Sequence, residues 1–315
     1  RYPHFVVPAH RLSEIRNFVS AGLQDFSVSR LREKMPWGID VPEDPSHVMY
    51  VWFDALVNYI STLGWPEDTK RFSDFWGTAD EPRAVQMAGK DNLRQQSAMW
   101  QAMLLSAGLP TSRRIFIHGF ITSGGAKMSK STGNVVDPFD LVRRYGTDAT
   151  RYYLLREIPA YEDGDFSEAK FRERYNADLA NGLGNFTARV TTLAAGTEPL
   201  PTTLATDPSV AVKIEAVSRA IAGRLDEYRF HEALAALWEL IAFGDAQVNE
   251  TKPWAMSSGP AKTKVLLDLI AILEGVASLL VPFLPGASAK IAGALSRENG
   301  VLRVRKIEPL FPRLS

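Results

Sequence analysis

A change of pattern near residue 156 constrains the fold of this chain more than any other feature. Before it, short apolar runs that look like strands alternate with a helical pattern over residues 92–107. The strand-like stretches lie within residues 48–60, 84–89 and 115–120. Because strands that alternate with helices form parallel sheets, we expect an α/β part with ligands at the carboxyl edge of its sheet.

After the change, every apolar pattern is helical. Ser167 is a candidate helix N-cap, and it precedes apolar residues at helical spacing: Phe171, Tyr175, Leu179, Phe186 and Val190. Further helical patterns follow, the last of them a long apolar run over residues 265–284. The sequence therefore predicts an incomplete α/β part of Rossmann type over residues 1–155 and an all-α helix bundle over residues 156–315.

Composition excludes several classes of site. The chain has no cysteine, and its five histidines show no ligand spacing, so we expect no metal site and no zinc. Lys and Arg number 36, as do Asp and Glu, so a nucleic-acid partner must be held by a local patch. The apolar run contains Asp268 and Glu274, which disfavours a membrane span, and no secretory signal is present. We expect a cytoplasmic protein.

The segment GGAKMSKSTGNVVDP, residues 124–138, follows the last strand-like run. A glycine pair frees its backbone, and Lys127 and Lys130 place two cations on flexible stems. Such a loop at the end of a buried strand indicates phosphate chemistry.

Four blocks of the sequence, taken in order, resemble the methionyl-tRNA synthetase family of class I aminoacyl-tRNA synthetases. They are YVWFDALVNYI, GKDNL, the KMSKS signature with its surroundings, and YNADLANGLGNFTAR. The resemblance implies a Rossmann-type catalytic domain and the end of its connective insertion within residues 1–155, followed by an anticodon-binding domain over residues 156–315. It also implies ATP with Mg²⁺, methionine and tRNA(Met) as the molecules bound.

For ATP, the resemblance implies two groups of residues. Gly89 and Asp91 match a Gly-Lys-Asp motif at the adenosine, and His118 lies where the family brings a histidine near the nucleotide. The KMSKS loop supplies Lys127, Met128, Ser129 and Lys130. The two lysines are the catalytic candidates, because cations on a closing loop stabilise the charge that develops on the phosphates in the transition state.

For the amino acid, the resemblance implies a pocket lined by Trp52, Ala55 and Tyr59, whose wide polarizable walls suit a thioether. The family usually has Phe-His shortly after Gly-Lys-Asp, but Gln95 and Gln96 stand there in this chain. Gln96 can still make hydrogen bonds in the pocket, whereas Gln95 does not supply the lost apolar surface.

For tRNA, the resemblance implies anticodon contacts from Asn185, Arg189 and Trp254. The first two are four residues apart and so share a helix face, and Trp254 follows Pro253 in a loop. Asn249 is a further candidate contact. Splayed bases need a stacking surface and edge-reading hydrogen bonds, which these side chains supply.

The leading interpretation is a methionine–tRNA ligase, and two alternatives stay open. One is a related class I ligase for another aliphatic amino acid, because the two glutamines alter the pocket. The other is a noncatalytic tRNA-binding module, since the family's His-x-Gly-His signature is absent from these residues. For the same reason we expect this chain to be part of a longer enzyme and inactive in adenylate formation by itself.

Overall fold

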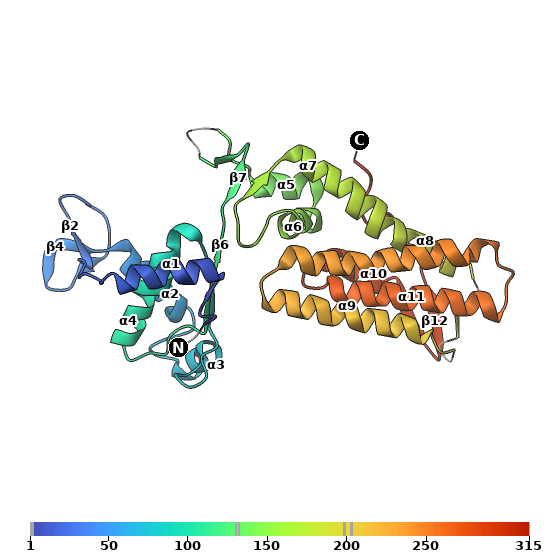
Figure 1. Ribbon diagram of the computed structural model, residues 1–315, viewed down its shortest axis with the longest axis horizontal. Helices are drawn as coiled ribbons and strands as arrows, with labels where there is room; N and C mark the ends of the chain where they lie inside the picture. Colours follow the sequence, from blue (N-terminus) through green and yellow to red (C-terminus); the bar gives the residue numbers. More distant parts are fainter. Residues whose placement is uncertain (1–2, 130, 132, 198–199, 202–203, 315) are drawn as a thin grey trace. The chain divides into compact units, whose positions relative to one another are not determined.

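The computed structural model describes residues 3–129, 131, 133–197, 200–201 and 204–314 (Figure 1). The chain forms two compact units, Arg1–Gly119 and Phe120–Ser315.

The first unit contains two three-stranded sheets and the helices around them. Its strands are β1 (Val6–Val7), β2 (Ser29–Leu31), β3 (Asp40–Val41), β4 (Asp44–Met49), β5 (Val85–Gly89) and β6 (Arg114–His118). Its helices are α1 (Ala9–Ser20), α2 (Val51–Ser61), α3 (Thr69–Trp76), η1 (Lys90–Asn92), η2 (Gln95–Met99) and α4 (Trp100–Ser106), of which η2 is a π-helix. The sheet β1-β6-β5 is parallel, and β2-β4-β3 is antiparallel.

The parallel sheet confirms the predicted alternation of strands and helices, with β6 in its centre. Three consecutive residues of β6, Ile115, Phe116 and Ile117, are buried, as expected for a strand covered on both faces. Helix α1 packs Leu12 and Ile15 into the same core.

Residues 48–60 differ from their prediction, because most of this apolar run is helix α2 rather than strand. Leu56 and Ile60 are one helical turn apart and both are buried, in a cluster with Trp76 and Trp100. Continuous apolar runs do not distinguish a buried strand from a helix, and here packing of one helix face decides.

The second unit is mostly helical. Its helices are α5 (Pro138–Tyr145), α6 (Thr147–Arg156), α7 (Glu168–Arg174), η3 (Tyr175–Gly184), α8 (Asn185–Ala195), α9 (Pro208–Asp226), α10 (Phe230–Thr251), η4 (Pro253–Ala255), α11 (Pro260–Leu280) and α12 (Pro285–Ala292), and η3 is a π-helix. Its strands are β7 (Ile121–Ser123), β8 (Ala126–Lys127), β9 (Gly164–Phe166), β10 (Leu200–Pro201), β11 (Leu295–Glu298) and β12 (Val301–Val304). Helices α9, α10 and α11 lie side by side (Figure 1).

One large core joins these helices and confirms the helical spacing predicted after Ser167. The residues Phe171, Tyr175, Leu179, Phe186 and Val190 are all buried in it. Within the described residues, no helix is both long and apolar enough to cross a membrane.

The prediction that residues 156–315 are all-α is wrong in detail, because β10, β12 and β11 form an antiparallel sheet. The turn between β11 and β12 is Asn299-Gly300, and both residues have positive φ, 50° and 75°. Asn-Gly is the favoured pair for a two-residue hairpin, so the sequence carried a hairpin signal that the helical pattern around it obscured.

The compact units also divide the chain earlier than the predicted boundary at residues 155/156. Strand β7 pairs with β9, and Tyr152 and Tyr153 of α6 lie in the core of the second unit. Residues 120–155 therefore pack with the helical part. The division by function into residues 1–155 and 156–315 stays a prediction.

Candidate functional site

The lysine loop begins as a tight hairpin between β7 and β8. Gly124 and Gly125 occupy its turn with φ of 64° and 74°, a conformation that glycine adopts without strain. Asp165 on β9 accepts hydrogen bonds from the Gly125 N–H and the Thr122 hydroxyl, each at 2.8 Å. The bond from the Gly125 backbone is the main reason that the pKa of Asp165 lies below its usual value. The turn is thus held by an ionised carboxylate.

The far side of the loop is closed by Asn134. Its Oδ1 accepts from the Ser129 N–H at 2.9 Å, and its Nδ2 lies 3.3 Å from the carbonyl oxygens of Ser123 and Lys127. The hydroxyls of Ser129 and Ser131 are 2.7 Å apart. These bonds fix the backbone on both sides of Met128.

Lys127 is an exposed cation on this loop. Its Nζ lies 4.5 Å from the centre of the Phe120 ring, which is a cation–π distance. Met128, the next residue, packs against the core of the second unit. The predicted catalytic residue Lys130 lies outside the described residues. The structure thus places Lys127 on the surface of a loop that Met128 anchors.

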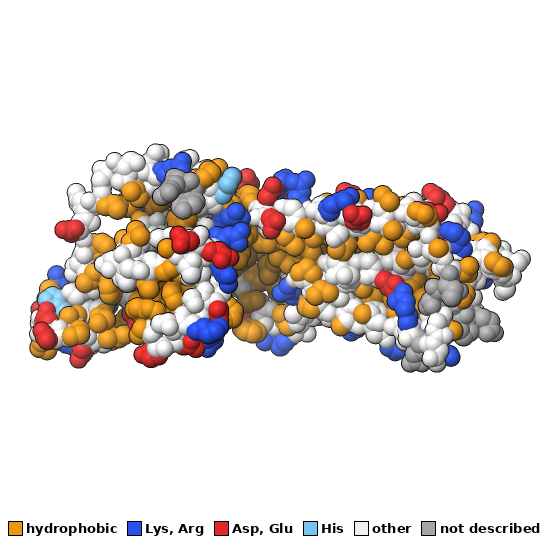
Figure 2. Space-filling model, turned by 90° about the horizontal axis from the view of Figure 1, so that it is seen from below, with side chains coloured by type: hydrophobic (Ala, Val, Ile, Leu, Met, Phe, Trp, Pro, Cys, Tyr) orange, Lys and Arg blue, Asp and Glu red, His pale blue; other side chains and the backbone are white. Residues whose placement is uncertain are grey.

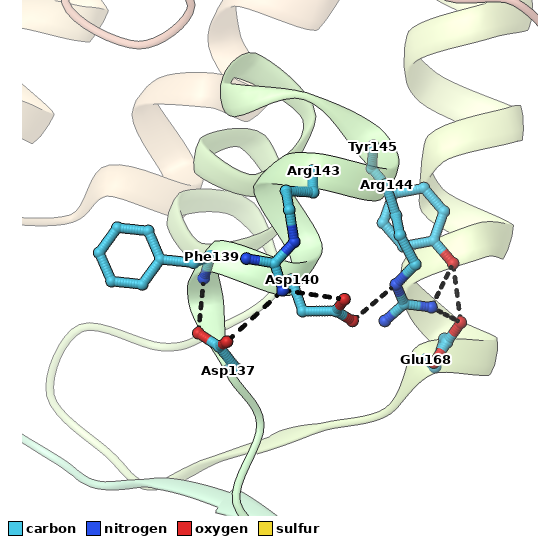
Figure 3. Close-up of polar contacts among 7 residues, drawn as sticks. All are labelled: Asp137, Phe139, Asp140, Arg143, Arg144, Tyr145 and Glu168. Carbon is cyan, nitrogen blue, oxygen red and sulfur yellow. Dashed lines mark hydrogen bonds and ion pairs between the residues drawn. The ribbon is translucent and has the colours of Figure 1, made fainter.

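Helix α5, which follows the loop, is tied to α7 (Figure 3). Asp137 caps α5 by accepting from the Phe139 N–H at 2.9 Å. Glu168 of α7 accepts from Tyr145 Oη at 2.7 Å and from Arg144 Nη1 at 2.6 Å. These two hydrogen bonds lower the pKa of Glu168, and the bond from Tyr145 has the larger effect. The carboxyl end of the loop is therefore attached to a fixed pair of helices.

The predicted nucleotide residues Gly89, Asp91 and His118 lie in the first unit. Gly89 ends β5 and His118 ends β6, and the two residues are register partners in the parallel sheet. Asp91 follows in η1, where it is exposed. The structure thus brings all three to the carboxyl edge of the sheet, where ligands of α/β proteins bind.

The predicted amino-acid residues Trp52, Ala55 and Tyr59 share one face of α2. Ala55 is exposed, and Trp52 and Tyr59 are half-buried. Gln96 on η2 is only 3% exposed, and its Nε2 donates to the Tyr59 hydroxyl at 2.9 Å. Gln96 therefore lies behind Tyr59 and contacts α2 through its hydrogen bond to the Tyr59 hydroxyl.

Three further polar residues surround Gln96, and the sequence analysis missed all of them. Gln86 Nε2 donates to Gln96 Oε1 at 3.2 Å, and Gln101 Nε2 donates to the Gln96 carbonyl at 2.9 Å. Ser112 binds both of these glutamines. A signal was available for Gln86 alone: it stands at an inward position of a strand whose neighbours alternate between exposed and buried.

Two of the predicted anticodon residues, Arg189 and Trp254, are brought together in the second unit. Arg189 on α8 lies over the Trp254 ring, 5.9 Å from its centre, although 65 positions separate them (254 − 189). Arg189 also donates to Asp245 at 3.1 Å and to Asn249 at 2.7 Å, both on α10. Asn185, one turn before Arg189 on α8, is exposed.

Gly244 explains how α10 comes near enough to α8 for these contacts. A Cβ on Gly244 would lie 2.3 Å from the ring of Phe186, so only glycine fits there. The next residue, Asp245, reaches Arg189 for this reason. Burial raises the pKa of Asp245, and the adjacent Arg189 offsets only part of this effect.

The charges around these sites are local. On the face shown in Figure 2, Lys and Arg side chains are interspersed with Asp and Glu. Among the residues that the structure describes, no three His, Cys, Asp or Glu side chains are arranged to hold a metal ion.

The chain is similar to known proteins in both sequence and structure. A family profile described as tRNA synthetases class I (M) matches residues 4–191. A methionine–tRNA ligase of Caldanaerobacter subterraneus subsp. tengcongensis is 38% identical, over 99% of this chain and 52% of its own length. One from Mesorhizobium japonicum is 42% identical, over 93% of this chain and 57% of its own length. The chain thus spans little more than half the length of these relatives.

Solved structures give the same result. The methionyl-tRNA synthetase of Mycobacterium tuberculosis bound by methionyl-adenylate superimposes with a TM-score of 0.88 at 33% identity. The match covers 98% of this chain and 65% of that one. The free form of the same protein matches with a TM-score of 0.85 at 32% identity.

Proposed function

This chain belongs to the tRNA synthetases class I (M) family, and on that premise we propose that it acts in a methionine–tRNA ligase. In that reaction methionine and ATP, as its Mg²⁺ complex, form methionyl-adenylate and pyrophosphate, and the methionyl group then passes to tRNA(Met). We place this activity in the cytoplasm. Residues 1–155 would contribute to the adenylation site, and residues 156–315 would bind the anticodon.

In adenylate formation, Lys127 stabilises the negative charge that develops on the phosphates. Its exposed ammonium on an anchored hairpin supports this role, because a flexible stem on a fixed base can follow the departing pyrophosphate. Lys130, Met128 and Ser129 complete the same loop in the proposal. The hydrogen bonds of Asn134 to this loop give the backbone of Lys127 a defined starting position.

The nucleotide end of the site consists of Gly89, Asp91 and His118. Gly89 lets the backbone approach the nucleotide, and Asp91 binds the ribose. The register pairing of Gly89 with His118 supports this assignment, since it places both at the same sheet edge.

The methionine side chain packs on Trp52, Ala55 and Tyr59, with Gln96 behind Tyr59. The partial exposure of Trp52 and Tyr59 on one face of α2 supports this wall, because a pure core role would bury both rings. Their aromatic surfaces suit a polarizable thioether.

The observation that carries the proposal is the contact of Arg189 with Trp254, with Asn185 one turn before Arg189 on the same helix. An exposed indole beside an oriented guanidinium offers a base both a stacking surface and hydrogen-bond donors. Arg189 donates hydrogen bonds to Asp245 and Asn249 on α10, so its remaining donors have a fixed direction.

The test is the binding of this chain to tRNA with a CAU anticodon, compared with the same tRNA carrying one changed anticodon base, at a fixed salt concentration of about 0.15 M. We expect a preference of about tenfold or more for CAU, the equivalent of one well-read base. Equal binding by the folded chain would contradict anticodon reading. Binding to neither tRNA would contradict it as well.

A further inference from the structure

A chain of buried hydrogen bonds runs through the first unit from the backbone of Ser112 to the hydroxyl of Tyr59. Between these ends lie Gln101, Gln86 and Gln96, and Ser112 and the three glutamines are only 2% to 7% exposed. Buried amides cost free energy unless both ends are paired, so the geometry of this chain is closely specified.

The direction of the chain is fixed at its far end, because a backbone N–H can only donate. Ser112 N–H donates to Gln101 Oε1 at 3.1 Å, so the opposite end of that amide is its NH₂ group. That group donates to the Gln96 carbonyl at 2.9 Å and to Ser112 Oγ at 3.2 Å. The Ser112 hydroxyl in turn donates its own hydrogen to Gln86 Oε1 at 2.6 Å.

The direction then passes from amide to amide. Since Gln86 accepts at its oxygen, its NH₂ group faces Gln96 and donates to Gln96 Oε1 at 3.2 Å. Gln96 therefore presents its own NH₂ group to Tyr59 and donates to the hydroxyl oxygen at 2.9 Å. The backbone N–H of Ser112 fixes the amide of Gln101, and the Ser112 hydroxyl, which accepts from Gln101 and gives its one hydrogen to Gln86, selects the orientation of Gln86 and through it that of Gln96.

At the near end, the Tyr59 oxygen accepts, and the hydroxyl hydrogen is left to donate elsewhere. Among the described residues, none accepts a hydrogen bond from it. We propose that Gln86, Gln101 and Ser112 are positioning residues that make the Tyr59 hydroxyl a donor toward the side chain of the bound amino acid. This inference rests on the proposed function, which places that side chain against Tyr59.

The consequence concerns the class of side chain that the pocket accepts. A fixed donor favours a side chain with a lone pair at that point, such as a thioether, over a hydrocarbon of the same length. If the amides were turned the other way, the Tyr59 hydroxyl would donate its hydrogen to Gln96 Oε1. Tyr59 would then present only lone pairs to the ligand. The residues behind the pocket, which do not touch the ligand, would then change its selectivity.

Gln86→Glu tests this, because the introduced carboxylate has nearly the same shape and only accepts. Gln96 must then turn its NH₂ group toward the carboxylate and its oxygen toward Tyr59. In the intact enzyme that contains this chain, ATP–pyrophosphate exchange would be measured with methionine and with norleucine, which replaces sulfur by CH₂. We expect the ratio of kcat/KM for methionine to kcat/KM for norleucine to fall about tenfold. The fall should come from a lower kcat/KM for methionine.

Ser112→Ala gives a second, milder test, since it removes the hydroxyl that selects the orientation of Gln86. We expect the same ratio to fall about threefold. Ser288→Ala is the matched control: Ser288 is 6% exposed and donates to the Ala277 carbonyl at 2.7 Å in the second unit. It loses a comparable buried bond and should leave the ratio unchanged. Thermal unfolding would show which variants fold.

The outcomes separate the inference from the proposed function. A lower ratio in both network variants, with no change in Ser288→Ala, supports the inference. If the wild-type enzyme prefers methionine and the folded Gln86→Glu variant keeps that preference, the inference is overturned while the proposed function stands. Should that variant not fold, an unchanged ratio in Ser112→Ala overturns it. Absence of methionine-dependent exchange in the wild-type enzyme overturns both together.

Discussion

The two regions of this molecule to which we assign recognition are built from different kinds of side chain. Beneath Tyr59, the first unit uses neutral amides that are almost completely buried and fully directed. Around Arg189, the second unit uses charges and an exposed indole, with Trp254 54% exposed. The first arrangement suits a small side chain that differs from its competitors by one atom, and the second suits a flexible polyanion.

The difference shows which kind of interaction would give each region its specificity. A buried network imposes direction at a cost in desolvation that its own bonds must offset. A partly exposed charged cluster costs less to build, and salt screens its contribution more than that of a buried network. Substitutions and solution conditions should therefore act on one region and spare the other.

The largest expected effect is on the lysine loop, to which we assign the phosphates of ATP and which should behave like the charged region. In the intact enzyme, Lys127→Ala should slow methionyl-adenylate formation about a hundredfold, because charge stabilisation in the transition state is lost. Lys170→Ala, another exposed lysine of the second unit, is the control and should change little. Single-turnover adenylation measures the effect, and a change within twofold would remove Lys127 from the mechanism.

Next is the indole of the anticodon region. Trp254→Ala should reduce the preference of this chain for a CAU anticodon about tenfold, in line with the loss of one stacked base. Trp37→Ala removes another exposed indole, 68% exposed, from the first unit and should leave binding unaltered. Filter binding with both tRNAs decides, and equal losses in the two variants would show a nonspecific effect.

A smaller effect is expected from pH. Burial raises the pKa of Asp245 above its ordinary value, so this carboxylate takes up a proton earlier than usual as the pH falls. Arg189 then loses its charged partner, and the CAU preference should fall by up to about fivefold as the pH is lowered from about 7 into the acidic range, the worth of a partly exposed ion pair. Asp245→Asn has no proton to gain, so its preference should not change over this range. A parallel decline in both proteins would assign the pH effect to other groups.

The smallest effect separates the two regions by salt. Doubling the salt concentration from about 0.15 M should weaken tRNA binding about threefold if two phosphate contacts release counterions. The methionine-to-norleucine ratio of the intact enzyme should stay constant over the same range, because its network is neutral and buried. A salt-dependent ratio would contradict the proposed division.

The sequence was informative wherever a property is local or periodic. Helical spacing located the apolar face that Phe171, Leu179 and Phe186 bury, and the alternation of strands and helices predicted the parallel sheet in which Gly89 and His118 are partners. It failed for α2, because an apolar run does not show whether Leu56 and Ile60 face a core as a helix or as a strand.

The site contacts that sequence reasoning missed are those between distant polar residues. Gln86, Gln101 and Ser112 belong to no motif, and only folding brings them around Gln96. Asp245 was missed for the same reason, since its role depends on the close helix approach at Gly244. Polar networks of this kind follow from tertiary packing, which a periodic pattern does not specify.

The π-helix η3 (Tyr175–Gly184) has a consequence for how this molecule tolerates changes in length. A π turn accommodates one residue more than an α turn, and η3 runs directly into α8, which carries Asn185 and Arg189. Loss of a single residue in η3 would convert a π turn into an α turn and keep the phase of α8, whereas loss of a residue within α8 before Arg189 would rotate Arg189 by about 100° relative to the turn before it. A one-residue deletion in η3 should therefore be tolerated better than one between Asn185 and Arg189 in α8, where the helix has no extra residue to lose.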